Sequence, residues 1–188
     1  MVGGGARVMV ERGFKADGRV LSTAELDRLV QDFIAHYASH IADASRPFDG
    51  VEAALDRLAG EGCRLAVCTN KLEWLSVRLL DALGLTARFA AICGADTFGV
   101  SKPDPAILRG TIGRAGGKPN HAVMIGDSLT DIATARAAGV PVIAVDFGYT
   151  DTPVAQLEPD RIISSYADLP GAVSGLAGLR QGGVPGNH

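Results

Sequence analysis

Apolar residues recur at helical spacing in the first part of the chain. Over 26–41 they return every three or four positions, which is the pattern of an amphipathic helix with one apolar face. Ser22 followed by Glu25 has the spacing of a capping box, so we expect this helix to begin just after Ser22. A shorter helix is predicted over 6–14, and the Arg-Pro-Phe-Asp-Gly run at 46–50 ends the helical pattern.

From residue 51 onward, short apolar runs alternate with segments of helical pattern. Each run predicts a buried strand and each intervening segment a helix. Strands are predicted over 64–68, 89–93, 121–125, 140–145 and 161–163, and helices over 51–58, 74–83, 105–115 and 130–138. This alternation predicts an α/β fold, in which a doubly wound parallel sheet is covered by helices on both faces. The Gly-rich segment 179–188 has no periodicity and predicts a disordered tail.

The composition is that of a globular domain and excludes several classes of partner. The 188 residues are 47% apolar and 21% charged, which is typical of one packed core. The net charge is −3 and no basic block is present, so neither nucleic acid nor an anionic membrane is expected as the main partner. No signal peptide is visible and no apolar run approaches the roughly 20 residues of a membrane span, so a cytoplasmic protein is expected. Cys63, Cys68 and Cys93 lack paired spacing, and we expect buried free thiols.

Polar residues follow two of the predicted strands, at the strand ends where ligands of such folds bind. Thr69, Asn70 and Lys71 follow the first strand, and a hydroxyl and an amide beside backbone N–H groups suit an anionic oxygen. Asp127 lies just after the strand predicted over 121–125, and Asp131 lies near the start of the next helix. The two carboxylates together could share Mg²⁺. In both places the alternative is a plain strand-to-helix turn whose side chains cap a helix.

A stiff turn lies between these two strand ends. Lys102 stands next to Pro103, and Asp104 and Pro105 begin the following helix, as N-cap and first helical residue. A stiffly held lysine can neutralise a phosphate or a carboxylate, although a lone Lys-Pro is also common in solvated loops.

The three motifs, in this order, resemble the haloacid dehalogenase superfamily of phosphatases. They match its second, third and fourth motifs, and the segments 2–6, 126–141 and 147–150 are similar to its phosphoglycolate phosphatase branch. The resemblance covers about 2–169. It implies a partial helical cap over 1–47 and a core of that family's α/β type over 48–178.

The resemblance also implies a role for each site residue. Thr69, the backbone at Asn70 and Ser128 would bind the phosphoryl oxygens, and Lys102 would neutralise phosphate and nucleophile. Asp127 would bind Mg²⁺ directly, and Asp131 would support the metal or its waters. The implied reaction is phosphoryl transfer to an aspartate and hydrolysis by water. The implied substrate is a small phosphorylated metabolite, with 2-phosphoglycolate indicated by the branch and sugar phosphates left open.

The family's first motif, a strand followed by Asp-x-Asp-Gly-Thr, is missing from the sequence. It would supply the nucleophile, the general acid/base and metal-binding oxygens. Asp17 and Asp49 each precede a glycine, but Asp17 follows no apolar strand and Asp49 lies in the break at 46–50. We therefore expect an N-terminally truncated chain or a misplaced start codon. The central strand between those ending at Thr69 and Asp127 would then be absent and the chain alone inactive.

Two alternatives stay open. A catalytically dead member of the family could bind a phosphorylated ligand or a partner. A phosphoacceptor receiver domain also uses Asp, Thr and Lys at strand ends, but in the order Asp, Thr, Lys, whereas here Thr69 and Lys102 precede Asp127.

Overall fold

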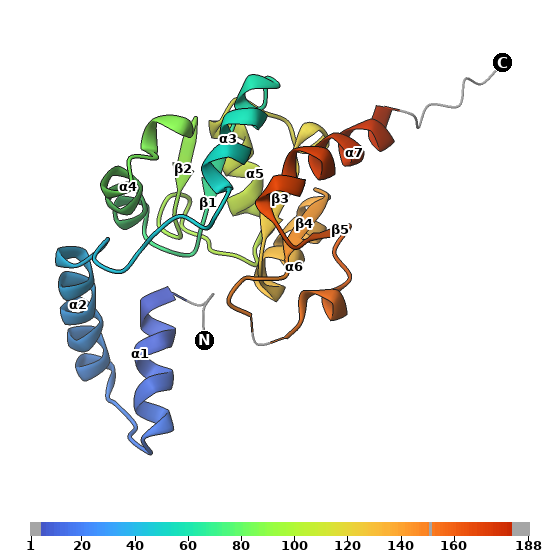
Figure 1. Cartoon of the computed structure of the whole chain (residues 1–188). Helices are drawn as coiled ribbons and strands as arrows, with labels where there is room; N and C mark the ends of the chain where they lie inside the picture. Colours follow the sequence, from blue (N-terminus) through green and yellow to red (C-terminus); the bar gives the residue numbers. More distant parts are fainter. Residues whose placement is uncertain (1–4, 151, 182–188) are drawn as a thin grey trace.

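The computed structural model describes residues 5–150 and 152–181 and divides them into a helix pair and an α/β core (Figure 1). The pair consists of α1 (Gly5–Ala16) and α2 (Thr23–Ser39), which contact each other and project from the core. The predicted capping box is confirmed: the Ser22 hydroxyl accepts from the backbone N–H of Glu25, and the Glu25 carboxylate accepts from that of Ser22. The chain then runs through 40–50 into the core.

Short parallel strands alternate with helices through the core. Its helices are α3 (Val51–Gly60), α4 (Glu73–Ala82), α5 (Pro105–Arg114), α6 (Leu129–Ala138) and α7 (Leu169–Gln181), and its strands are β1 (Ala66–Cys68), β2 (Ala91–Cys93), β3 (Met124–Gly126), β4 (Val142–Val145) and β5 (Arg161–Ile163). Four turns of 3₁₀ helix connect them, η1 (Thr86–Arg88), η2 (Pro119–His121), η3 (Val154–Leu157) and η4 (Tyr166–Asp168).

All strand pairs are parallel, as predicted, but the described strands form two sheets rather than one. One sheet has the order β1-β2, with Cys68 opposite Cys93, and the other has the order β3-β4-β5. The break falls between β1 and β3, where the family resemblance places its central strand. The edge of β1 that faces the break is not paired with the facing edge of β3, so each strand leaves a row of backbone groups directed at the break.

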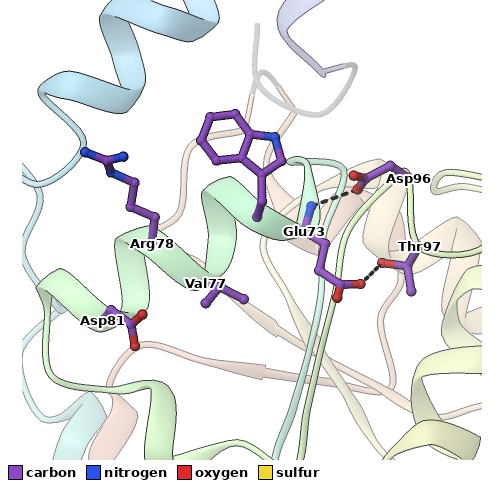
Figure 2. Close-up of a pocket in the computed structure, with 7 residues that line it drawn as sticks. Glu73, Val77, Arg78, Asp81, Asp96 and Thr97 are labelled. Carbon is purple, nitrogen blue, oxygen red and sulfur yellow. Dashed lines mark hydrogen bonds between the residues drawn. The ribbon is translucent and has the colours of Figure 1, made fainter.

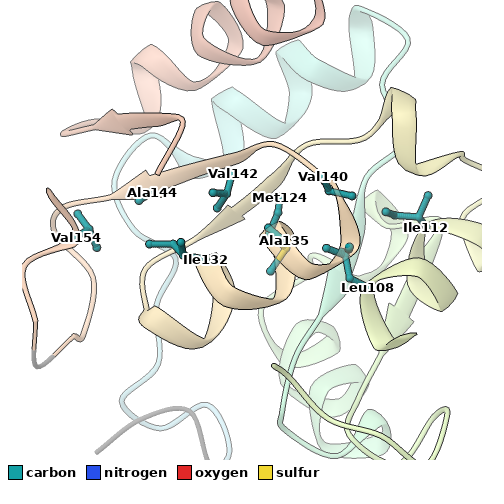
Figure 3. Packing of buried hydrophobic residues seen from close by; sticks show 10 residues of the cluster. Leu108, Ile112, Met124, Ile132, Ala135, Val140, Val142, Ala144 and Val154 are labelled. Atoms are coloured by element: carbon teal, nitrogen blue, oxygen red, sulfur yellow. The ribbon is translucent and has the colours of Figure 1, made fainter. Parts of the chain in front are cut away.

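Helices cover both faces of the three-stranded sheet. On one face, Val142 and Ala144 of β4 pack against Ile132 and Ala135 of α6 (Figure 3). Ile143 and Val145 point to the other face and pack with apolar side chains of α3 and α7, among them Ala54, Leu58, Leu169 and Leu176. Every residue of β4 is buried, which is typical of a strand covered on both sides. The prediction of a doubly wound α/β core is thereby confirmed.

Several boundaries differ from the predictions. The strand predicted over 121–125 begins only at Met124, because residues 119–121 form η2 instead. Helix α7 was not predicted, and it includes the first three residues of the segment 179–188, where a disordered tail was expected; residues 182–188 lie outside the described residues. Cys63 is exposed, contrary to the expectation of three buried thiols, since it follows the end of α3 at the surface. Within the described ranges, no helix combines the length and apolarity needed to cross a bilayer.

Candidate active site

The loop after β1 is fixed to the end of β2. The backbone N–H of Thr69 donates to the carbonyl of Cys93 at 3.0 Å, which continues the β1-β2 ladder by one bond. The Thr69 hydroxyl oxygen accepts from the backbone N–H of Lys71 at 3.1 Å. The hydroxyl hydrogen of Thr69 has no acceptor among the residues that the structure describes, so it remains able to donate to a ligand oxygen.

Asn70 joins this loop to the stiff turn before α5. Its side-chain amide donates to the carbonyl oxygen of Lys102 at 3.0 Å, and its side-chain oxygen accepts from the backbone N–H of Lys102 at 2.7 Å. This reciprocal pair holds the two loops together although 32 positions separate them in sequence. The structure therefore uses the Asn70 side chain as a clamp on Lys102, and only its backbone stays a candidate for phosphate binding.

Lys102 is directed at the start of α6. Its ammonium lies 2.6 Å from Oδ1 of Asp131, and the two side chains are 12% and 6% exposed. The predicted proximity of Lys102 to the strand end at Asp127 is confirmed, because the backbone N–H of Asp127 donates to the other oxygen of Asp131 at 3.2 Å. A continuous set of hydrogen bonds thus connects the ends of β1 and β3 across the break between the sheets.

Asp131 closes a capping box at the N-terminus of α6. Ser128 is the N-cap: its hydroxyl donates to Oδ2 of Asp131 at 2.7 Å and accepts from the backbone N–H of Asp131. Burial opposes ionisation of Asp131, but the Lys102 ammonium and these hydrogen bonds outweigh it and lower the pKa of the carboxyl below its ordinary value. The capping interpretation weighed for this turn is confirmed for Asp131. Metal binding by Asp131 and phosphate binding by Ser128 stay predictions, and both side chains are engaged in the box.

Asp127 is held differently and keeps one oxygen open. Its Oδ2 accepts from the backbone N–H of Tyr149 at 2.9 Å. Its Oδ1 has no partner within residues 5–150 and 152–181. The loop over 147–149 approaches so closely that a Cβ at Gly148 would lie 2.1 Å from the Cβ of Asp127, so only glycine fits there without a shift.

The donor set at this edge suits Mg²⁺ but is small. The open oxygen of Asp127 is a hard ligand of the kind that Mg²⁺ prefers, and this ion commonly keeps several waters. The described residues contain no group of three or more His, Cys, Asp or Glu side chains that could hold a metal ion together. Protein oxygens from these residues would therefore give only a weak site.

The structure also has a cavity away from these strand ends. A cavity of about 730 Å³, open to solvent, lies along α4 and contains none of the predicted site residues; it is lined by Glu73, Trp74, Val77, Arg78, Asp81, Asp96 and Thr97 (Figure 2). Its central carboxylate, Glu73, is already bound to Thr97 and to Arg114. Because Glu73 is already paired and the lining includes none of the predicted site residues, we place the candidate active site at the strand ends rather than in this cavity.

Sequence reasoning missed three contacts of the site: the clamp by Asn70, the backbone support of Asp127 by Tyr149, and a contact between Lys71 and Tyr37 of α2. The first two join loops far apart in sequence, and no local pattern indicates them. Lys71 belongs to the polar group at 69–71 that the sequence indicated, but the direction of its side chain depends on where α2 packs.

The fold and these strand ends define a hydrolase of the haloacid dehalogenase type, and the comparison with family models agrees. The model described as "Haloacid dehalogenase-like hydrolase" matches residues 13–145, which is more than half of the chain. The chain belongs to this family.

Relatives within the family share much of the sequence. A "Phosphoglycolate phosphatase" of Mesorhizobium japonicum is 53% identical over 168 residues, which cover 89% of this chain and 74% of the relative. Another of that name, from Agrobacterium fabrum, is 49% identical over 169 residues, covering 90% of this chain and 72% of the relative. The crystal structure of a predicted phosphoglycolate phosphatase from Haemophilus somnus superposes with a TM-score of 0.83 at 29% identity, over 91% of this chain and 78% of that one.

Proposed function

We propose that this chain carries the phosphate-binding and metal-binding part of a phosphatase acting on a small phosphorylated metabolite, 2-phosphoglycolate. The reaction is Mg²⁺-dependent phosphoryl transfer to an aspartate followed by hydrolysis. The hydrogen bonds that bring Thr69, Lys102 and Asp127 to one edge of the core carry the proposal. The names of the similar proteins support the substrate. The proposal places the protein in the cytoplasm, where such metabolites occur.

Each residue contributes a separate part of phosphate recognition. The Thr69 hydroxyl donates to a phosphoryl oxygen, together with backbone N–H groups of its loop. The Lys102 ammonium supplies the positive charge that offsets the phosphate dianion. Asp131 is a positioning residue, since it aims Lys102 without contacting substrate.

Asp127 is the residue that would hold Mg²⁺, through the oxygen that the Tyr149 amide leaves open. When bound, this ion neutralises charge that develops on the phosphoryl oxygens during transfer. Asp127 also remains hydrogen-bonded to Tyr149 in that role, which fixes the direction of its carboxylate.

The nucleophilic aspartate is the part that these residues do not supply. Asp17 follows the end of α1 and Asp49 precedes α3, and both are exposed. Within the part of the chain that the structure describes, neither carboxylate forms a hydrogen bond with Thr69, Lys102 or Asp127. We therefore propose that the aspartate lies on a strand outside these 188 residues that pairs between β1 and β3, and that the chain alone hydrolyses little substrate.

One observation also favours a second candidate function. Among the described residues the proposed site has groups suited to binding phosphate but no aspartate placed as its nucleophile, and this favours a binder of phosphorylated ligands. The two functions differ in what happens when the missing strand is provided.

Phosphate release from 2-phosphoglycolate with Mg²⁺ distinguishes them. The 188-residue chain is compared with the same chain preceded in frame by a strand ending in Asp-x-Asp-Gly-Thr and the intervening cap helices. We expect little release by the first and turnover by the second, with most of that turnover lost on Asp127→Asn. An inactive extended chain that still binds phosphate would favour the binder, and rapid turnover by the short chain would overturn the proposed source of the nucleophile.

A further inference from the structure

A second lysine lies in the loop that carries Thr69. Lys71 lies two positions after Thr69, and its backbone N–H bonds the Thr69 hydroxyl oxygen at 3.1 Å. Its carbonyl oxygen accepts from the N–H of Ala95, so the backbone on both sides of this lysine is fixed. The side chain leaves this loop toward the helix pair.

Tyr37 of α2 holds the end of that side chain. The Lys71 ammonium donates to the Tyr37 hydroxyl at 2.5 Å and lies 4.1 Å from the centre of the tyrosine ring, within the range of a cation–π contact. Tyr37 itself packs on the apolar cluster formed by Ala38, Ile41 and Leu75, and its ring stacks on that of Phe33. The ammonium is therefore held in place by a rigid neighbour and not left to move in solvent.

Lys71 has no counter-ion in the part of the chain that the structure describes. Its partners there are the hydroxyl and the ring of Tyr37, whereas Lys102, in the neighbouring loop, is paired with Asp131. A half-buried ammonium is costly without an anion, and a phenol offsets only part of that cost. An added negative group should consequently be attracted more strongly to Lys71 than to Lys102.

The placement of Lys71 fits a ligand that extends from the phosphate site toward the helices. The first turn of α1 approaches the same loop: a Cβ at Gly5 would lie 3.6 Å from the carbonyl oxygen of Asn70. The space beside Thr69 is thus bordered by the core on one side and by the helix pair on the other. If a small phosphate monoester binds at Thr69, the rest of the molecule would lie between the core and the helix pair.

We propose that Lys71, positioned by Tyr37, binds a second anionic group of the substrate, a carboxylate, while the phosphate is bound near Thr69 and Lys102. This inference rests on the proposed function and assigns substrate selection to one contact between the helix pair and the core. It predicts that phosphate monoesters with a carboxylate are preferred over neutral ones of the same size.

Phosphorus NMR titrations of the 188-residue chain with Mg²⁺ test the inference by binding alone. The three ligands are inorganic phosphate, ethyl phosphate and 2-phosphoglycolate. For the wild type we expect 2-phosphoglycolate to bind about tenfold more tightly than ethyl phosphate, as one charge-assisted hydrogen bond provides. Lys71→Met should bring this ratio close to one and leave the affinity for inorganic phosphate within about threefold of the wild type. Tyr37→Phe keeps the ring but not the hydroxyl and should reduce the ratio less.

Two controls separate this inference from the proposed function. Lys118→Met removes an exposed lysine before η2, at the opposite end of β3, and should leave every affinity unchanged. Lys102→Met should weaken all three ligands alike. If Lys102→Met weakens all three ligands while Lys71→Met keeps the wild-type preference for 2-phosphoglycolate over ethyl phosphate, only the role of Lys71 is overturned. An equal loss for all three ligands in Lys71→Met also overturns it, and a wild type that binds neither phosphate nor 2-phosphoglycolate overturns both proposals.

Discussion

The ammonium of Lys102 and the carboxylate of Asp131 lie 2.6 Å apart, across 29 positions of sequence. This pair connects the loop before α5 to the first turn of α6, and Asn70 extends the connection to the end of β1. The described strands of the two sheets do not pair across the break, yet the ends of β1 and β3 are joined by these side chains.

Removing one member of this pair should be costly for stability. Asp131→Asn leaves a nearly buried ammonium without its anion, and we expect it to lower the free energy of unfolding by about 3 kcal/mol. Urea unfolding measures the loss. Asp131→Asn combined with Lys102→Met should lose less than the sum of the single changes, because no unpaired charge remains. Additive losses would show that the pair is not coupled.

Gly148 should tolerate no side chain because of its contact with Asp127. Alanine there would place its Cβ 2.1 Å from that of Asp127, so the loop or the carboxylate must move. We expect Gly148→Ala to reduce stability by about 1–3 kcal/mol and to weaken Mg²⁺ binding further than the stability loss explains.

The matched control is Gly113→Ala in α5, where an added Cβ meets nothing within 4 Å. This change should stabilise the protein by up to about 1 kcal/mol, since alanine is the better helix former. Equal stability of Gly148→Ala and the wild type in urea would contradict the close contact with Asp127.

The three cysteines should react at different rates with iodoacetamide. Cys63 is exposed, whereas Cys93 is completely buried. Burial, the leading cause, raises the pKa of the Cys68 thiol, so less of the reactive thiolate forms at a given pH. Peptide mapping of the native protein should show Cys63 modified first, Cys68 slowly and Cys93 only after unfolding. The rate at Cys68 should still rise above the pH at which that of free cysteine in solution has levelled off, and a Cys68 profile identical to that of free cysteine would contradict this account.

The sequence was sufficient for the order of the five strands and of the α-helices before α7, because apolar runs, caps and glycines are local signals. It also identified Asp104 as the N-cap of α5, and the structure shows its carboxylate accepting from Ala106 at 2.8 Å. Helix α7 went unpredicted because its composition, with three glycines, resembles a loop and its apolar residues are fixed by packing on β4.

Site residues were easier to find than their contacts. Thr69 and Asp127 stand beside strand ends, where position alone suggests chemistry, and Lys102 stands in a stiff proline turn just before α5. By contrast, Asn70 and Asp131 bind protein groups in the structure, and the partners of both come from other loops or from a helix cap. Spacing along the chain does not encode such pairings, since they depend on how the loops meet in space.

The affinity for inorganic phosphate, measured with and without Mg²⁺, tests most directly whether Thr69, Lys102 and Asp127 form one site. The wild type should bind phosphate more tightly when Mg²⁺ is present, because the ion held by Asp127 adds positive charge beside Lys102. Asp127→Asn should bind phosphate with the wild type's metal-free affinity and show no further gain from Mg²⁺. The same gain in both proteins, or no phosphate binding by the wild type, would contradict the site described above.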